Sequence, residues 1–254
     1  MSTTRTILIT GSAKRIGKSL VEYFAHKGWN VAIHYHTSEE AAKELAHRLS
    51  TLDIKVAIFK ADLKDESSYS SLIECINQKF GPLSCLINNA SSFEYDSALT
   101  TDKNSWDLHM ETNLRAPFVL SQQFVKQLPT DTVGNIINII DPRVWNLTPH
   151  FISYTLSKAG LWTLTQTLAL ALAPRVRVNA IAPGPALKNY KQSEEHFKEQ
   201  CKNTPLKKGP DLEEIARAAE FILNTPSLTG QMLALDAGQH MGWAFPKQSV
   251  SVYD

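Results

Sequence analysis

The sequence has few of the residues that build disulfide frameworks and metal sites. Its three cysteines are Cys75, Cys85 and Cys201, and it has neither a Cys-x-x-Cys pair nor a histidine cluster at metal-ligand spacing. A chain of this kind is typical of a reducing compartment. We therefore predict inert, buried thiols and no metal site.

The chain also lacks an excess of charge and a long hydrophobic run. Lys plus Arg number 26 and Asp plus Glu 25, a net charge of +1 at pH 7, so no overall field favours nucleic acid or an anionic membrane as partner. Residues 1–5 lead into a short strand without the apolar segment of a signal peptide, and no stretch is long enough to cross a membrane. We expect a cytoplasmic protein with local anion sites.

What the chain does contain is an alternation of short apolar runs with amphipathic helical stretches. The runs, at 6–10, 31–35, 56–60, 83–88, 134–140, 176–182 and 232–236, alternate with helical patterns at 14–27, 39–49, 67–80, 106–128, 154–172 and 211–223. Runs that are apolar on both faces are typical of a parallel sheet covered by helices on each side. This predicts an α/β fold, with residues 1–254 forming a single-domain, doubly wound Rossmann sheet of about seven strands.

One segment breaks the alternation. Residues 185–210 are rich in Lys, Glu, Gln and Asn and contain Pro185, Pro205 and Pro210. Such a segment within a compact domain is more often a functional loop than a linker. We predict an excursion above the sheet that acts as a lid over the substrate.

A glycine turn joins the first strand to the first helix. Gly11 permits the tight turn and Gly17 the close packing of helix on strand, so the N–H groups that open the helix can face a pyrophosphate. An acid at the end of the second strand would repel a 2′-phosphate, but His36 stands there. With Lys14 and Arg15 in the loop, this favours NADP over NAD. The alternatives are a turn without a ligand and solvated cations.

Two later strand ends add to the predicted cofactor site. Asp62 follows the third strand, where it can accept from the adenine amino group, and Asn88-Asn89-Ala90 ends the fourth. His34 alternates inward from His36 and is predicted to be a packed core histidine.

Tyr154 and Lys158 are four residues apart at the start of a predicted helix, so both project from one face. A tyrosine near its reference pKa of about 10 is a poor acid–base group at neutral pH. A neighbouring ammonium that stabilises the phenolate lowers this pKa. We predict this role for Lys158, together with donation to the nicotinamide ribose.

Taken together, these motifs resemble the short-chain dehydrogenase/reductase family along nearly the whole chain. They are Thr10-Gly11-x-x-x-Arg15-x-Gly17, Asp62, Asn88-Asn89-Ala90, Asn113, Tyr154-x-x-x-Lys158 and Pro183-Gly184. The resemblance implies hydride transfer at nicotinamide, Tyr154 as proton donor, Asn113 holding a water in the proton path, and a homotetramer. The cofactor residues implied are Gly11, Lys14, Arg15, Ile16, Gly17, His36, Thr37, Ser38, Asp62, Leu63, Asn89, Ala90, Ser91, Lys158, Pro183 and Gly184.

Four departures from the general family pattern resemble the pteridine reductases within it. They are Arg15 for the middle glycine of the loop, Asp141 where most members carry a serine, His34-Tyr35-His36-x-Ser38, and Asn89-Ala90-Ser91-Ser92-Phe93. This resemblance implies that Phe93 stacks the pterin against the nicotinamide and that Ser91 contacts cofactor and pterin. Arg15, Asp141 and Tyr154 complete the implied substrate site.

Asp141 also favours an imine-like substrate on chemical grounds. Reducing a ketone places negative charge on oxygen, which a carboxylate opposes, whereas reducing C=N delivers a proton to nitrogen, which a carboxyl can relay. We therefore predict NADPH-dependent reduction of a dihydropterin or dihydrofolate. The alternatives are a ketone reductase, a non-catalytic NADP sensor, and an Asp141 that merely caps the turn before Pro142. Trp243, in the tail, is interpreted as a pocket wall or an interface residue.

Overall fold

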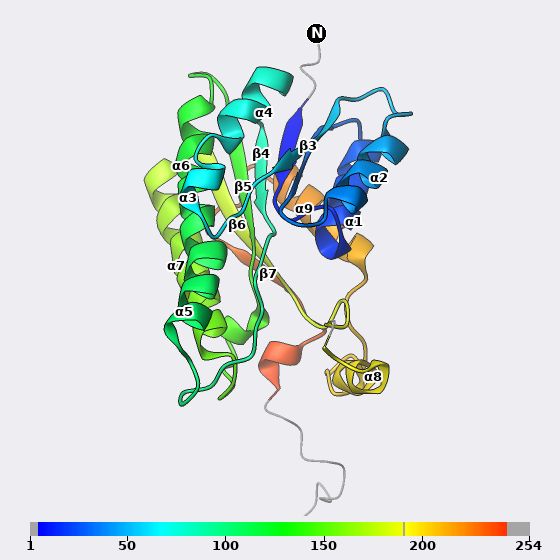
Figure 1. Ribbon diagram of the computed structural model, residues 1–254, viewed down its shortest axis with the longest axis vertical. Coiled ribbons are helices and arrows are strands. Elements are labelled where there is room, and N and C mark those ends of the chain that lie inside the picture. The colour runs from blue at the N-terminus through cyan, green and yellow to red at the C-terminus, as the bar shows by residue number, and fades with distance from the viewer. Residues whose placement is uncertain (1–4, 190, 243–254) are drawn as a thin grey trace, which may run out of the picture.

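The computed structural model describes residues 5–189 and 191–242, and these form a seven-stranded parallel sheet (Figure 1). The strands are β1 Thr6–Ile9, β2 Asn30–Tyr35, β3 Val56–Lys60, β4 Cys85–Asn88, β5 Gly134–Ile139, β6 Val176–Pro183 and β7 Met232–Leu235. They are ordered β3-β2-β1-β4-β5-β6-β7, all paired in parallel. The predicted α/β Rossmann fold is confirmed. Trp243 lies outside the described residues.

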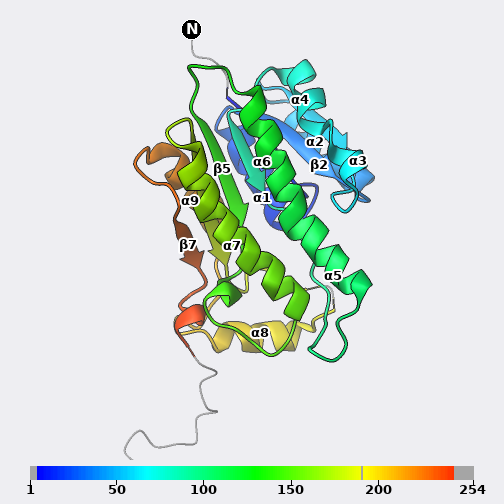
Figure 2. The same ribbon diagram turned by 90° about the vertical axis from the view of Figure 1, so that its left-hand side faces the viewer.

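Helices cover both faces of the sheet because both faces are apolar. On one side α1 Arg15–His26, α2 Glu39–Leu49 and α9 Leu212–Asn224 pack on a core that includes Ile7 and Ile9. On the other, α4 Leu72–Phe80, α6 Ala116–Gln127 and α7 Ile152–Leu172 pack on a core that includes Leu8 (Figures 1 and 2). Ile7, Leu8 and Ile9 are fully buried, as expected of a strand covered on both sides.

Three predicted segments differ from the structure. Residues 67–80 form two helices, α3 Glu66–Tyr69 and α4, because Asp65 caps the first and a serine pair ends it. Residues 106–128 form α5 Lys103–Met110, a π-helical turn Glu111–Arg115, and α6. The excursion at 185–210 contains α8 Glu194–Lys202, which has no buried residue and lies beyond the carboxyl ends of the strands (Figures 1 and 2).

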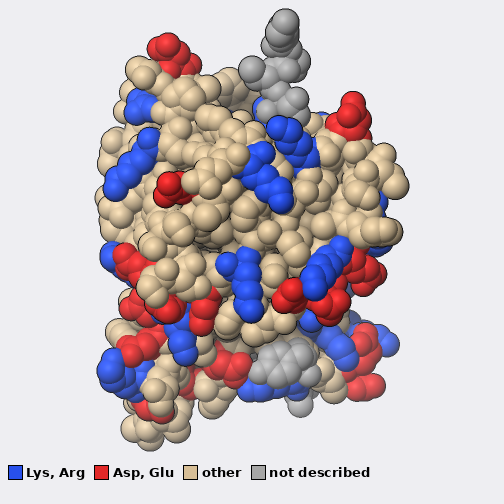
Figure 3. All heavy atoms as spheres, turned by 45° about the horizontal axis from the view of Figure 1, so that its top comes forward, with Lys and Arg blue, Asp and Glu red and all other residues tan. Residues whose placement is uncertain are grey.

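The surface and the thiols can be compared with the composition. Lys and Arg are interspersed with Asp and Glu on the face shown in Figure 3, in keeping with the small net charge. The prediction of buried thiols is wrong in part, because Cys85 is buried but Cys75 is exposed on α4 and Cys201 is half-buried on α8. Within the described part of the chain, no helix is both long and apolar enough to cross a membrane.

Candidate active site

The phosphate loop lies where the strand order reverses, between β1 and β4. Gly11 has a φ of 61°, in the left-handed region, and a Cβ there would lie 2.9 Å from Ala90 Cα. Asn89 donates its side-chain amide to the carbonyls of Thr10 and Gly11 at 2.8 and 3.2 Å. The end of β4 thus holds the loop in place at the crevice where doubly wound sheets bind their ligands.

His34 is buried under this loop, as predicted, and also has a contact that the sequence did not reveal. The Gly11 N–H donates to His34 Nδ1 at 2.9 Å, so the ring Nε2 is left to donate to the Ala61 carbonyl at 3.2 Å. Burial lowers the pKa of His34 to about 4. A neutral ring of one fixed tautomer therefore supports the turn.

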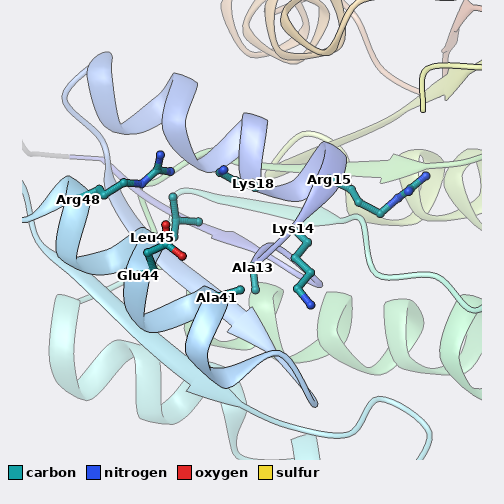
Figure 4. Close-up of a pocket in the computed structure, with 8 residues that line it drawn as sticks. All are labelled: Ala13, Lys14, Arg15, Lys18, Ala41, Glu44, Leu45 and Arg48. Atoms are coloured by element: carbon teal, nitrogen blue, oxygen red, sulfur yellow. The ribbon is translucent and has the colours of Figure 1, made fainter. Parts of the chain in front are cut away.

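The start of α1 fits an anion. Its N-cap, Lys14, makes no side-chain capping bond, and the first turn contains no acid, so the first N–H groups remain available to a phosphate. Lys14, Lys18 and Arg48 line a cavity of about 230 Å³ between α1 and α2 (Figure 4). Arg48 and Lys18 both approach Glu22. Lys14 has no carboxylate partner in residues 5–189 and 191–242.

Arg15 also lines that cavity, and its side chain extends to the side opposite Arg48 (Figure 4). Its backbone has a φ of 56°, unusual for a residue other than glycine. Its guanidinium donates to the carbonyls of Lys188 and Leu187 at 2.9 and 3.3 Å. The structure therefore places this predicted phosphate ligand between the phosphate loop and the excursion.

The remaining predicted cofactor residues surround the same edge of the sheet. His36 and Asp62 lie just after the ends of β2 and β3, and His36 Nε2 is 3.6 Å from Asp62 Oδ2. Gly184 packs closely against Asp236, where a Cβ would lie 2.7 Å from Asp236 Cα. Along the edge also lie the half-buried Ile16, Ser38 and Pro183, the buried Gly17 and Leu63, and the exposed Thr37 and Ser91.

Tyr154 and Asp141 meet, as the chemistry requires. Tyr154 lies in the first turn of α7 and Asp141 just beyond β5, and the tyrosine hydroxyl donates to Asp141 Oδ2 at 2.9 Å. Asp141 Oδ1 accepts from the Arg143 N–H at 2.8 Å. The capping interpretation is therefore also correct, and it leaves the other oxygen facing the tyrosine.

Lys158 is buried on the same face of α7. Its ammonium donates to the Ile139 carbonyl at 2.9 Å and lies 5.8 Å from the centre of the Tyr154 ring. Burial lowers the pKa of Lys158 to about 8, and Asp141 opposes this shift. The lysine is thus held behind the tyrosine, with the charge that it carries sensitive to mildly alkaline pH.

The predicted lowering of the Tyr154 pKa by Lys158 is wrong for the protein described here. Burial and the negative charge of Asp141 raise the pKa of Tyr154 well above 10, with Arg143 and Ser91 opposing the rise. A phenol whose anion would lie beside a carboxylate keeps its proton. Tyr154 therefore keeps its proton at physiological pH, and its predicted role as proton donor stays a prediction.

Asn113 is fully buried in the π-helical turn and fixes the loop after β4. It accepts from the Ser92 N–H at 2.8 Å and donates to the Ser92 carbonyl at 3.0 Å and to Ser157 Oγ at 3.1 Å. Both amide hydrogens are thus used within the protein. Its predicted role in holding a water stays a prediction.

Phe93 belongs to an aromatic cluster at the mouth of the site. Its ring stacks on Phe151, with centroids 4.5 Å apart, and meets Tyr154 edge to face at 4.6 Å. The Arg143 guanidinium lies 4.8 Å from the Phe151 centroid and 5.2 Å from that of Phe93. The sequence analysis missed Arg143 and Phe151. The position of Arg143 two residues after Asp141 was the available signal for the first.

The lid contacts both sides of this site. Arg15 binds its start, and Lys191 pairs with Glu94 at 2.6 Å, next to Phe93. The excursion therefore spans from the phosphate loop to the aromatic cluster. Its predicted role as a lid over a bound substrate stays a prediction.

A seven-stranded doubly wound sheet with Tyr154, Lys158 and a glycine turn at one edge defines a nucleotide-dependent oxidoreductase. Residues 5–199 match the family model described as short chain dehydrogenase. The chain belongs to the short-chain dehydrogenase family, and the predictions of the family and of an oxidoreductase are confirmed.

Several solved structures and curated proteins resemble this chain. A FolM alternative dihydrofolate reductase 1 from Brucella canis, in complex with NADP, is 41% identical with a TM-score of 0.93, covering 99% of each chain. The Brucella suis protein of the same name, also with NADP, is 42% identical with a TM-score of 0.89, covering 95% of this chain and 98% of that one. Glucose 1-dehydrogenase 2 of Bacillus subtilis is 29% identical, covering 97% of both. The 3-oxoacyl-[acyl-carrier-protein] reductase FabG of Staphylococcus aureus is 28% identical over 95% of this chain and all of that one. The cofactor predicted from the sequence, NADP(H), is the one these solved structures contain.

Proposed function

We propose that this protein uses NADPH to reduce the C=N bond of a dihydropterin or dihydrofolate to the tetrahydro form. The observation that carries the proposal is the 2.9 Å hydrogen bond from the Tyr154 hydroxyl to Asp141. It puts a carboxylate beside the proton donor, at the position where most members of the family have a serine.

The charge of Asp141 separates two classes of substrate. A ketone gains negative charge on oxygen as hydride arrives, and two unit charges about 4 Å apart repel by roughly 4 kcal/mol at an effective dielectric constant of about 20. That corresponds to roughly a thousandfold loss of rate. An imine nitrogen gains a proton instead, and the amino and ring N–H groups of a pterin donate to a carboxylate. Asp141 therefore favours C=N over C=O.

The other residues have roles consistent with this reaction. NADPH, when bound, supplies the hydride. The first turn of α1, Lys14 and the end of β2 at His36 would hold its phosphates, and Lys158 its nicotinamide ribose. Tyr154 delivers the proton, Asp141 orients the tyrosine hydroxyl and accepts from the substrate N–H groups, and Phe93 offers a ring for stacking. The Brucella dihydrofolate reductases support this assignment through their 41% and 42% identity.

A ketone reductase is the second candidate. It is favoured by the glucose dehydrogenase and 3-oxoacyl reductase relatives, which match over nearly the whole chain at 28–29% identity. Against it stands the Asp141 carboxylate facing Tyr154.

The substitution Asp141→Ser separates the two candidates. We expect it to slow reduction of dihydrobiopterin and dihydrofolate by about 10²-fold, because misplacing the proton donor and the substrate by about 1 Å can cost that much. The affinity for NADPH should stay within about twofold, since the phosphate loop is untouched. Oxidation of NADPH is followed by absorbance with both dihydropterins and a panel of ketones. Unchanged pterin rates, or turnover of ketones alone by the unaltered protein, would refute the pterin assignment.

The homotetramer implied by the family resemblance is also proposed. Four copies would give a sedimentation-equilibrium mass four times the 28.3 kDa of the chain. A mass that stays at one or two copies at assay concentration would rule this out.

A further inference from the structure

A buried polar network lies directly behind Tyr154. It consists of Asp96 in the loop after β4, His109 on α5, and Ser153 on α7. Their exposed fractions are 2%, 0% and 0%. Polar side chains buried this deeply are kept only where their hydrogen bonds are made, so the bonds of these three residues define what the network does.

The hydrogen bonds form one directed chain. The Glu94 N–H donates to His109 Nε2 at 3.0 Å, which leaves the hydrogen on Nδ1. His109 Nδ1 lies 2.7 Å from Ser153 Oγ and therefore donates to it. The Ser153 hydroxyl in turn donates to Asp96 Oδ2. Because the Ser153 proton points to a carboxylate and its oxygen is inaccessible, this serine is not a nucleophile.

The same network joins three elements around the tyrosine. Asp96 also accepts the Ser153 N–H at 3.3 and 3.4 Å, and its backbone carbonyl accepts the Phe151 N–H at 2.8 Å. A carboxylate therefore satisfies an N–H in the first turn of α7, where the helix dipole stabilises negative charge. The His109 ring meets Tyr154 edge to face, with centroids 5.9 Å apart.

We propose that His109, Ser153 and Asp96 are positioning residues that set the distance between the side chains of Tyr154 and Phe93. This inference rests on Tyr154 being the proton donor, as proposed above. It does not depend on whether the substrate is a pterin or a ketone. Each end of the network has its own target. The Glu94 end fixes Phe93, the neighbouring residue, whereas the Ser153 end fixes Tyr154, the next residue along α7.

The protonation state of His109 matters to this arrangement. Burial lowers its pKa. Asp96 and Glu94 from the loop after β4, with the Ser105 carbonyl on α5, oppose that shift, and Lys158 on α7 adds to it. A second proton on Nε2 would face the Glu94 N–H, so only the neutral ring can make both bonds. The network therefore holds Phe93 and Tyr154 in place while His109 is neutral.

Two substitutions at His109 remove one bond each. His109→Asn places an amide nitrogen where Nδ1 stands and keeps donation to Ser153, but no longer reaches the Glu94 N–H. His109→Gln places an oxygen near Nε2 and keeps the Glu94 bond. Leaving one buried group unpaired changes an equilibrium by roughly tenfold. We expect His109→Asn to raise the KM for the substrate by roughly tenfold with little change in kcat. His109→Gln should have a KM close to that of the unaltered protein.

Ser153→Ala tests the other end. We expect it to lower kcat by roughly tenfold while KM changes less. Ser121→Ala is the matched control, because Ser121 is also buried, on α6, and among the described residues its hydroxyl bonds only the Pro117 carbonyl at 2.6 Å, outside the site. The control should leave both constants within about twofold. Dihydrobiopterin is the substrate, or whichever ketone the protein turns over.

A measurement without turnover keeps the inference independent of the proposed reaction. The Glu94 amide should exchange slowly with deuterium in the unaltered protein and in His109→Gln, and much faster in His109→Asn. Equal exchange in all three, or equal effects of the Asn and Gln substitutions on KM, would overturn the proposal. If His109→Asn does not fold, the effect of Ser153→Ala on kcat and the exchange rate of the Glu94 amide in His109→Gln decide the question. A Ser153→Ala protein with the same kcat as Ser121→Ala would refute the proposal.

Discussion

The cofactor half and the substrate half of this site are built by different means. In the first, hydrogen bonds to backbone groups hold the phosphate loop. The Ser12 N–H donates to the His34 carbonyl at 2.9 Å, and Asn89 bonds to carbonyls of the phosphate loop. In the second, side chains bond to one another, as Tyr154 does to Asp141 and His109 to Ser153. A loop held through its backbone depends little on the identity of its side chains, whereas a pocket built from side chains can be altered by single substitutions.

The largest expected effect is a loss of rate from a substitution in the substrate half alone. Tyr154→Phe removes the proton donor, which typically contributes about 10²- to 10⁴-fold to rate. NADPH binding, measured by fluorescence, should stay within about twofold because the phosphate loop is untouched. A Phe variant that retains more than a tenth of the rate would show that the proton comes from elsewhere.

The second prediction concerns the cofactor half and the pH dependence of the free energy of unfolding. The pKa of His34 falls from its ordinary value of 6.5 to about 4 on folding. Below pH 6.5 the unfolded chain therefore binds a proton that the folded chain refuses. The stability contributed by this group declines as pH drops from 6.5 toward 4, by roughly 3 kcal/mol in total.

Urea unfolding between pH 4 and 7 measures this decline. The variant His34→Asn, which can still accept from the Gly11 N–H, should lose stability less steeply over the same range. His26→Asn, at an exposed position near the end of α1, is the control and should follow the unaltered protein. If the free energy of unfolding fell equally steeply with pH in His34→Asn and in the unaltered protein, the buried ring would not cause the loss of stability at low pH.

The smallest effect concerns the lysine that serves both halves. Lys158 has a pKa lowered to about 8 and is charged below it. We expect kcat/KM to fall above about pH 8, by about tenfold for each further unit as the charged fraction falls. Tyr154 cannot cause this limb, because its own pKa is raised. Initial rates from pH 6 to 9.5 measure the profile, and a flat curve to pH 9 would contradict the assignment.

The cofactor half could be predicted because its signals are local. Strand bounds matched to within one or two residues, since uninterrupted apolar runs between polar turns define buried parallel strands. The Gly11 turn at the end of the first strand followed from the spacing of its glycines and from the family resemblance. In this half of the site, the local sequence pattern was therefore enough to predict the strands and the turn of the folded chain.

The missed features depend on contacts that spacing does not encode. His109 and Ser153 are 44 residues apart, and Asp96 and Ser153 are 57 apart. No periodicity links them. Helix α8 was missed because none of its residues is fully buried and most of them are charged or polar, so the apolar pattern of a helix is weak there. The pKa of Tyr154 was predicted in the wrong direction because Lys158 was weighed while burial and Asp141 were not.

The two ends of the lid meet at its base. A Cβ on Gly209 would lie 2.0 Å from the Pro185 carbonyl oxygen, so the backbone there approaches as closely as only glycine permits. A segment whose ends touch can change in length or be exchanged between relatives at little cost to the sheet beneath, since closing a longer loop adds little free energy.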